Sequence, residues 1–117
     1  MPSIGLYDGV VGGAVVTLSD GSFITTCNDA SQVHVLTSGR VALNLYCAGV
    51  AISGGGDFYD ADSAAGDLSA VSIEGSGTWE ATFALNGGVM EVNLSASGTG
   101  TLGSTPVGLV YEFAGTR

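Results

Sequence analysis

The chain of 117 residues carries 11 acidic residues against two cations, Arg40 and Arg117, which gives a net charge of -9. Without rows of Lys and Arg it lacks the means to neutralise nucleic-acid phosphates or to bind an anionic membrane surface. The length is that of a single domain spanning residues 1–117, and 45% hydrophobic residues are too many for a disordered chain.

Apolar and polar residues alternate along most of the chain, as in strands that bury one face. Between residues 40 and 47, for example, Val41, Leu43 and Leu45 share one face. No segment has the apolar period of a long helix, and no apolar run approaches the ~20 residues that a membrane-spanning helix needs. Nine runs alternate, near residues 4–7, 10–18, 22–27, 32–37, 40–48, 68–74, 78–85, 89–96 and 107–113. One of them is marginal, so the alternation predicts about eight strands.

Glycine-containing dipeptides punctuate these runs, because Gly and Asn reach the positive φ that tight hairpins require. The dipeptides are Asp8-Gly9, Asp20-Gly21, Ser38-Gly39 and Asn86-Gly87. The short connections predict an all-β, single-domain, antiparallel fold, either a β-sandwich or a flattened β-barrel. The segment 53–67 is expected to be an irregular crossover loop between two halves of the domain.

Those halves resemble each other when residues 33–54 are aligned with residues 82–103, and Gly39 then falls on Gly88. An internal duplication is one explanation. The other is that two unrelated hairpins use the same turn chemistry. A duplication predicts two related hairpin units within the domain.

The two cysteines, Cys27 and Cys47, each end a strand-like run. A disulfide between them would stabilise the fold by about 3 kcal/mol. The alternative is a pair of separate buried thiols, which is the usual state in a reducing cytosol. A metal site of cysteine and histidine is not indicated, because the chain has no CxxC motif and one His.

The glycine-rich segment that starts at Gly54 holds four of the chain's Asp residues: Asp57, Asp60, Asp62 and Asp67. Calcium takes six to eight oxygen ligands, so these carboxylates make Ca²⁺ the candidate metal of the chain. The spacing lacks the closing Glu of an EF-hand loop. The other interpretation is a solvated acidic loop whose Asp side chains cap turns, with no cofactor.

Aromatic and apolar residues in the long acidic segment and near the N-terminus are candidate partner contacts. Phe58 and Tyr59 stand together in the same acidic segment, and Ile4 and Tyr7 lie near the N-terminus. Aromatic side chains dominate the energetics of many protein interfaces. Trp79, in contrast, alternates with further apolar residues, so we expect it in the core and not on a sugar-stacking platform.

The residues typical of catalysis do not form a recognisable site. His34, the single His, alternates with two valines and is expected to face away from them. No GxSxG, HExxH or phosphate-loop motif is present. Four glutamates, which could serve glycoside hydrolysis only as a facing pair, lie on the presumed outer faces of strands: Glu74, Glu80, Glu91 and Glu112. We therefore expect no enzymatic activity.

Two resemblances suggest where such a protein works. The stretch from Thr26 to Cys47, with a valine-rich strand, a Thr37-Ser38-Gly39 turn and a second strand ending in Cys, resembles a pattern in small secreted bacterial proteins. That pattern covers under a fifth of the chain and implies no activity. As a whole, the short, acidic, glycine-rich chain is similar in composition to small capsid decoration proteins.

The sequence thus favours a non-enzymatic structural protein of a virus or phage particle. In this hypothesis it lies on the virion surface and packs against identical copies and a protein scaffold. The first alternative is a secreted bacterial module that binds carbohydrate or a surface partner. In the second alternative, a small β-barrel binds an apolar ligand in its interior. No leader is visible after Met1, which fits a virion protein or a chain whose signal peptide has been removed.

Overall fold

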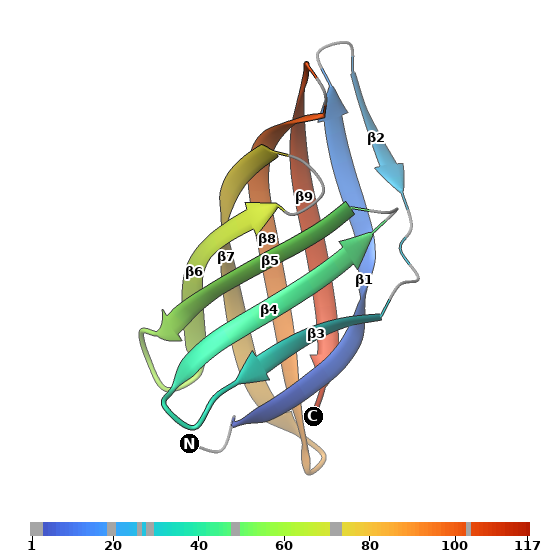
Figure 1. Ribbon diagram of the computed structural model, residues 1–117. Helices are drawn as coiled ribbons and strands as arrows, with labels where there is room; N and C mark the ends of the chain where they lie inside the picture. Colours follow the sequence, from blue (N-terminus) through green and yellow to red (C-terminus); the bar gives the residue numbers. More distant parts are fainter. Residues whose placement is uncertain are drawn as a thin grey trace.

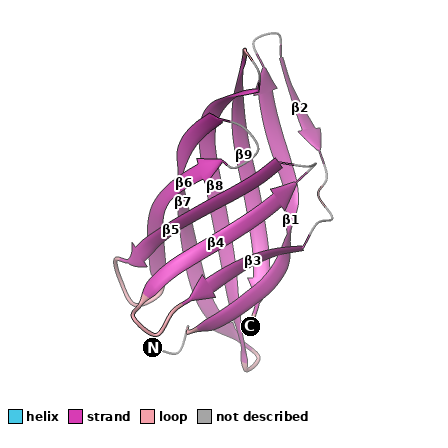
Figure 2. Cartoon of the chain, viewed as in Figure 1, coloured by secondary structure: helices cyan, strands magenta, loops and turns pink. Residues whose placement is uncertain are grey.

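The computed structural model describes residues 4–18, 21–25, 27, 30–47, 50–70, 74–102 and 104–117. This part of the chain forms nine strands and no helix (Figures 1 and 2). In chain order they are β1 (Gly5–Leu18), β2 (Gly21–Thr25), β3 (Ala30–Val35), β4 (Arg40–Cys47), β5 (Val50–Phe58), β6 (Ser63–Ala70), β7 (Glu74–Asn86), β8 (Val89–Leu102) and β9 (Thr105–Thr116). No helix that could cross a membrane occurs among the described residues.

The strands form one antiparallel sheet that closes on itself. From β3 to β9 each strand pairs with the next, and the long strand β1 pairs with β3 on one side and with β9 on the other. The predicted all-β fold is therefore confirmed, and it is a barrel of eight strands with β2 as an additional strand outside the closed ring (Figure 1). Closure leaves each of the eight barrel strands with a hydrogen-bonded neighbour on both sides.

The residues that alternate in the sequence face alternately into the barrel and out to its surface. In β4 the residues alternate strictly between exposed and buried. At Gly12 the register of β1 with β9 shifts. Because of this β-bulge the inward residues Val11 and Ala14 are three positions apart instead of two. The largest fully buried side chains are Trp79, Tyr7, Tyr111, Leu43, Leu45 and Leu94. Trp79 thus lies in the core, as its periodicity predicts.

Both ends of the chain lie at the lower end of the barrel as drawn in Figure 1. Aromatic side chains pack together in the core. The ring of Phe83 meets Tyr7 edge-on at a centroid distance of 5.3 Å and Phe58 at 5.1 Å. The backbone N–H of Arg117 donates to the carbonyl of Met90 at 3.0 Å, and its guanidinium donates to the carbonyl of Ile4. These contacts connect the two ends of the chain.

Two core tyrosines make stability sensitive to alkaline pH. Burial raises the pKa of Tyr7 above 10.0, with Arg117 acting in the opposite direction, and burial also raises the pKa of Tyr111. Because the unfolded state then releases these protons first, their contribution is complete below about pH 10 and is lost as the pH rises through the folded-state values. We expect urea midpoints to fall between about pH 9 and about pH 11. The fall should be shallower in the Tyr7→Phe/Tyr111→Phe double variant, and an equal fall in both proteins would contradict this.

Pairs of glycines face each other across neighbouring strands at inward positions. They are Gly9 with Gly115, Gly56 with Gly66, Gly75 with Gly100 and Gly77 with Gly98. The approach is closest at Gly56 and Gly66, where a Cβ would lie 2.0 Å from the carbonyl oxygen of Ala65 and of Gly55, respectively. Glycine at such positions allows a barrel strand to bend sharply without a side chain blocking its neighbour.

The segment 53–67 is not the crossover loop predicted from the sequence. Residues 53–58 belong to β5 and residues 63–67 to β6, and the two strands form a hairpin paired from Ile52↔Ala70 to Phe58↔Ala64. Of the three glycines that suggested a loop, Gly54 and Gly56 are inward positions of a bent sheet and Gly55 faces outward. The predicted turn at Asp8-Gly9 is also wrong, because both residues lie within β1 and pair with β3 and β9.

Both predicted hairpin units occur, as β3–β4 and β7–β8. Their turns contain glycines with nearly the same positive φ, 86° at Gly39 and 84° at Gly88. Only Gly adopts this conformation without strain, so the shared spacing can come from turn chemistry alone. The internal duplication therefore stays a prediction.

Candidate interaction surface

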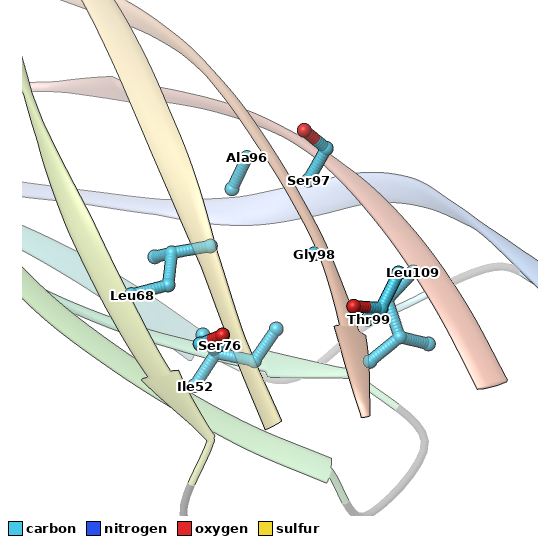
Figure 3. A pocket seen from close by; sticks show the side chains of 8 residues that line it. All are labelled: Ile52, Leu68, Ser76, Ala96, Ser97, Gly98, Thr99 and Leu109. Carbon is cyan, nitrogen blue, oxygen red and sulfur yellow. The ribbon is translucent and has the colours of Figure 1, made fainter. Parts of the chain in front are cut away.

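The interior offers little room for a ligand. A cavity of about 20 Å³ lies between the β5–β6 side and the β8–β9 side of the barrel (Figure 3). Ile52, Leu68, Ala96 and Leu109 contribute apolar side chains to its lining. A volume of this size holds about one water molecule, whereas small-molecule sites usually measure hundreds of cubic ångströms.

The predicted contact residues separate into core and surface. Tyr59 is 63% exposed in the turn between β5 and β6. Phe58 and Ile4 are partly buried and pack against the core. Tyr7 is 0% exposed and has Phe83 against its ring. Tyr7 is therefore not available to a partner, because the period-two pattern that begins in β1 turns it inward.

The four Asp residues proposed for calcium occupy two kinds of position. Asp60 and Asp62 lie in the β5–β6 turn, where Asp60 accepts a hydrogen bond from the backbone N–H of Asp62 at 2.8 Å. Asp57 and Asp67 are exposed on the outer faces of β5 and β6. Among the described residues no group of three or more His, Cys, Asp or Glu side chains is placed to hold a metal ion. The Asp60 carboxylate instead stabilises the turn through its hydrogen bond with the backbone of Asp62.

The polar residues considered for catalysis lie on the outside of the barrel. His34 is exposed on β3, with Leu6 and Ala42 as its neighbours on the adjacent strands. Glu80 and Glu112 flank Ser95 in one row across β7, β8 and β9, and the Ser95 hydroxyl donates to Glu112 at 3.1 Å. A depression of about 530 Å³ on this side is lined by both polar and acidic residues, among them Asp67, Thr78, Glu80, Ser95 and Ser97.

Charge is distributed unevenly over the outer surface. We use the term uncharged wall for residues 9–18 of β1, 21–25 of β2, 97–102 of β8 and 105–111 of β9, which contain no Asp, Glu, Lys, Arg or His. The strands are neighbours in the order β8-β9-β1-β2, so these segments form one continuous area. In a protein with a net charge of -9 the residues of this area add no charge of their own, so they do not repel an approaching acidic molecule.

The uncharged wall also exposes apolar side chains. Val15 and Val110 are neighbours across β1 and β9, and they are 36% and 38% exposed. Beside them runs a shallow groove of about 550 Å³ lined mainly by small and uncharged residues, among them Thr17, Thr99 and Pro106. Depletion of charge together with exposed apolar area is typical of the central part of protein interfaces.

The strand β2 ends the sheet at this wall. It pairs with residues 14–18 of β1 along one side, and in the described part of the chain no strand pairs with its other side. Figure 1 shows β2 at the margin of the molecule, next to the upper half of β1. An unpaired strand edge presents backbone N–H and C=O groups that can pair with another strand.

A disulfide between Cys27 and Cys47 holds the chain that leaves β2. Cys27 follows β2, and Cys47 is the last residue of β4, on the wall of the barrel. Nearby, the backbone N–H of Tyr46 donates to the hydroxyl of the buried Ser31 at 3.0 Å. The additional strand is thus connected to the barrel through the β1 ladder and through a covalent bond.

Removing the disulfide should lower stability and loosen β2 first. For the Cys27→Ser/Cys47→Ser variant we expect a loss of about 3 kcal/mol in the free energy of unfolding, because the unfolded chain regains the freedom of the closed loop. Urea unfolding followed by Trp79 fluorescence measures the loss, since Trp79 is the single Trp. Hydrogen exchange should show the largest increase in residues 21–25. Unchanged exchange there would contradict the anchoring role.

The uncharged wall was not predicted from the sequence, although its composition is visible there. Two uncharged runs, residues 9–19 and 97–111, lie far apart along the chain. Only the pairing of β1 with β9 makes them neighbours. The signal that could have found them is the absence of charge over long strands in an acidic protein.

Comparison with protein-family models, with curated proteins and with solved structures finds no match to this chain. Its function is therefore inferred from the geometry of the barrel and its surface.

Proposed function

We propose that this protein is a non-enzymatic structural component of a virus or phage particle, similar in role to a capsid decoration protein. It acts through protein–protein contacts of its outer β surface with identical copies and with a protein scaffold. The observation that carries the proposal is the uncharged wall, which concentrates exposed valines and an unpaired strand edge on one side of an acidic barrel.

Three features indicate that the protein acts through the outer surface of its barrel and not through a site inside the barrel. The described interior cavity has about 20 Å³, far less than the hundreds of cubic ångströms usual for a small-molecule site. The carboxylates lie mainly on the outer faces, where they favour solubility. The closed barrel is a stable platform, because its eight strands have neighbours on both sides.

Immunogold labelling tests the particle location. An antibody against this protein should label intact particles purified from a culture that expresses it, and the label should remain after a wash in high salt. Protein found only in the medium, with unlabelled particles, would overturn the virion proposal.

The alternative of a secreted binding module is favoured by one observation, the Cys27–Cys47 disulfide. Disulfides form and persist mainly outside the reducing cytosol. The same fractionation separates the two proposals, because a secreted module accumulates in the medium as oxidised protein that sediments with no particle. A free-thiol assay on the unfolded protein distinguishes the oxidised form from the reduced form.

A further inference from the structure

The side of β2 that faces away from β1 pairs with no strand in the part of the chain that the structure describes. The backbone of β2 is extended and is held in register with β1 from Leu18↔Gly21 to Ala14↔Thr25. The disulfide at Cys27 restrains its trailing end. A strand that is already ordered loses less conformational entropy when another strand pairs with it. Recognition at such an edge comes from main-chain hydrogen bonds, so the occupant must itself be an extended segment.

The charge distribution indicates which extended segment fits. Two copies of this protein carry -9 each and repel one another over most of their surfaces. The uncharged wall adds no charge of its own to this repulsion, and β2 itself, Gly21–Thr25, has no charged residue. An antiparallel edge is also self-complementary, because a twofold axis places the same strand opposite itself.

We propose that a second copy of this chain docks at the uncharged wall by antiparallel β2–β2 pairing, which extends the sheet from one barrel into the other. This inference rests on the proposed function and gives the self-association in it a place and a geometry. The exposed Val15 lies on β1 opposite Ile24 of β2, beside the paired strands, and contributes apolar contact area. Val110 lies one strand further from the edge, on β9. A paired strand of five residues is a small interface, so we expect a dissociation constant of about 10 µM.

Solution mass measures the association directly. Light scattering at protein concentrations from about 1 µM to about 500 µM should show a change from monomer to dimer. Raising NaCl from about 0.02 M to about 0.5 M should tighten the dimer several-fold, because salt screens the repulsion between the two acidic barrels. A mass that stays monomeric over the whole range would overturn the inference.

A charge placed on the wall tests the location. Val15→Glu adds a carboxylate at an exposed position of β1, opposite Ile24 of β2, and should weaken the dimer at least tenfold. Thr82→Glu is the matched control, since it adds the same charge at an exposed position on the outer face of β7. Equal weakening by the two variants would overturn the proposed location.

Proline tests the strand edge. Consecutive residues of a strand direct their N–H groups to opposite sides, so of Ser22 and Phe23 one donates toward β1 and the other away from it. Proline lacks this N–H. We expect one of the variants Ser22→Pro and Phe23→Pro to abolish the dimer while the thermal midpoint stays close to that of the wild type. A dimer that persists in both variants would overturn β2 pairing.

The results also separate this inference from the proposed function. An oligomer of the wild type that is insensitive to both the wall variant and the proline variants refutes docking at β2 but supports assembly through another surface. If the particles are labelled but the protein stays monomeric at every concentration, docking at β2 is refuted and attachment to the particle through another surface is supported. Unlabelled particles together with a dimer that depends on β2 refute the virion role and support the docking site.

Discussion

Replacement of Trp79 by alanine is expected to lower the free energy of unfolding by about 4 kcal/mol, the usual cost of removing a large buried aromatic side chain. Trp79 is 1% exposed, and its indole N–H donates to the carbonyl of Gly55 at 3.3 Å. Near its indole lies Gly54, where a Cβ would be 3.4 Å from the ring. The side chain therefore fills space that glycines in the opposite strands leave open.

Urea unfolding followed by circular dichroism measures this loss, because the variant has no other Trp. Trp79→Phe is the control. It keeps most of the apolar volume and removes the hydrogen bond to Gly55, so its loss should be smaller, about 1–2 kcal/mol. If Trp79→Ala cost no more than Trp79→Phe, the indole could not be the main filling of this part of the barrel.

The substitution Gly66→Ala is expected to lower the free energy of unfolding by about 4 kcal/mol, which is large for the addition of one methyl group. A Cβ at Gly66 would lie 2.0 Å from the carbonyl oxygen of Gly55. That atom belongs to the backbone of the paired strand, so the overlap can be relieved only if β5 and β6 separate. Trp79 fluorescence in urea reports the change.

The neighbouring glycine provides a matched control. At Gly55 a Cβ would face outward and find its nearest atom, the carbonyl oxygen of Val41, at 3.5 Å. Gly55→Ala should therefore leave stability within about 1 kcal/mol of the wild type. Gly98→Ala, where the nearest backbone atom would be at 2.6 Å, should fall between the two. Equal effects at Gly66 and Gly55 would show that the glycine pairs are not needed for the bend.

Where strands alternate clearly, their positions could be predicted from the sequence. The strand β4 follows the expected pattern from Arg40 to Cys47, and Trp79 faces the core as its spacing predicts. The hairpin turn at Asn86-Gly87 is also correct, with a φ of 59° at Gly87. These features depend on neighbours in the chain, which is the range over which periodicity and turn chemistry act.

The strand β5 could not be predicted in this way. Three consecutive glycines, Gly54–Gly56, interrupt its apolar pattern and are typical of loops. Their role depends on Gly66 and Trp79, which are distant in the sequence and come close only after the sheet has closed. A glycine that ends a strand and a glycine that bends one look the same in the sequence.

The candidate site shows the same limit. Tyr59 is exposed as a partner contact requires, but Tyr7 is buried because its position in the alternation of β1 faces the barrel interior, whereas its neighbour Leu6 is 44% exposed. The uncharged wall combines segments from β8, β9, β1 and β2. Its parts are visible in the sequence, but their adjacency depends on closure between the first and the ninth strand.

By itself the sequence determined an acidic all-β domain, the alternation of its strands and the positions of two of its hairpin turns, because these depend on composition and on residues close in the chain. The tertiary structure decided that the sheet is a barrel, that glycines lie inside it and that β2 stays outside the ring. The physical reason is that closure depends on pairing between Val11 of β1 and Phe113 of β9 and their neighbours, which are separated by almost the whole chain. Local patterns carry no information about which distant strand becomes the partner.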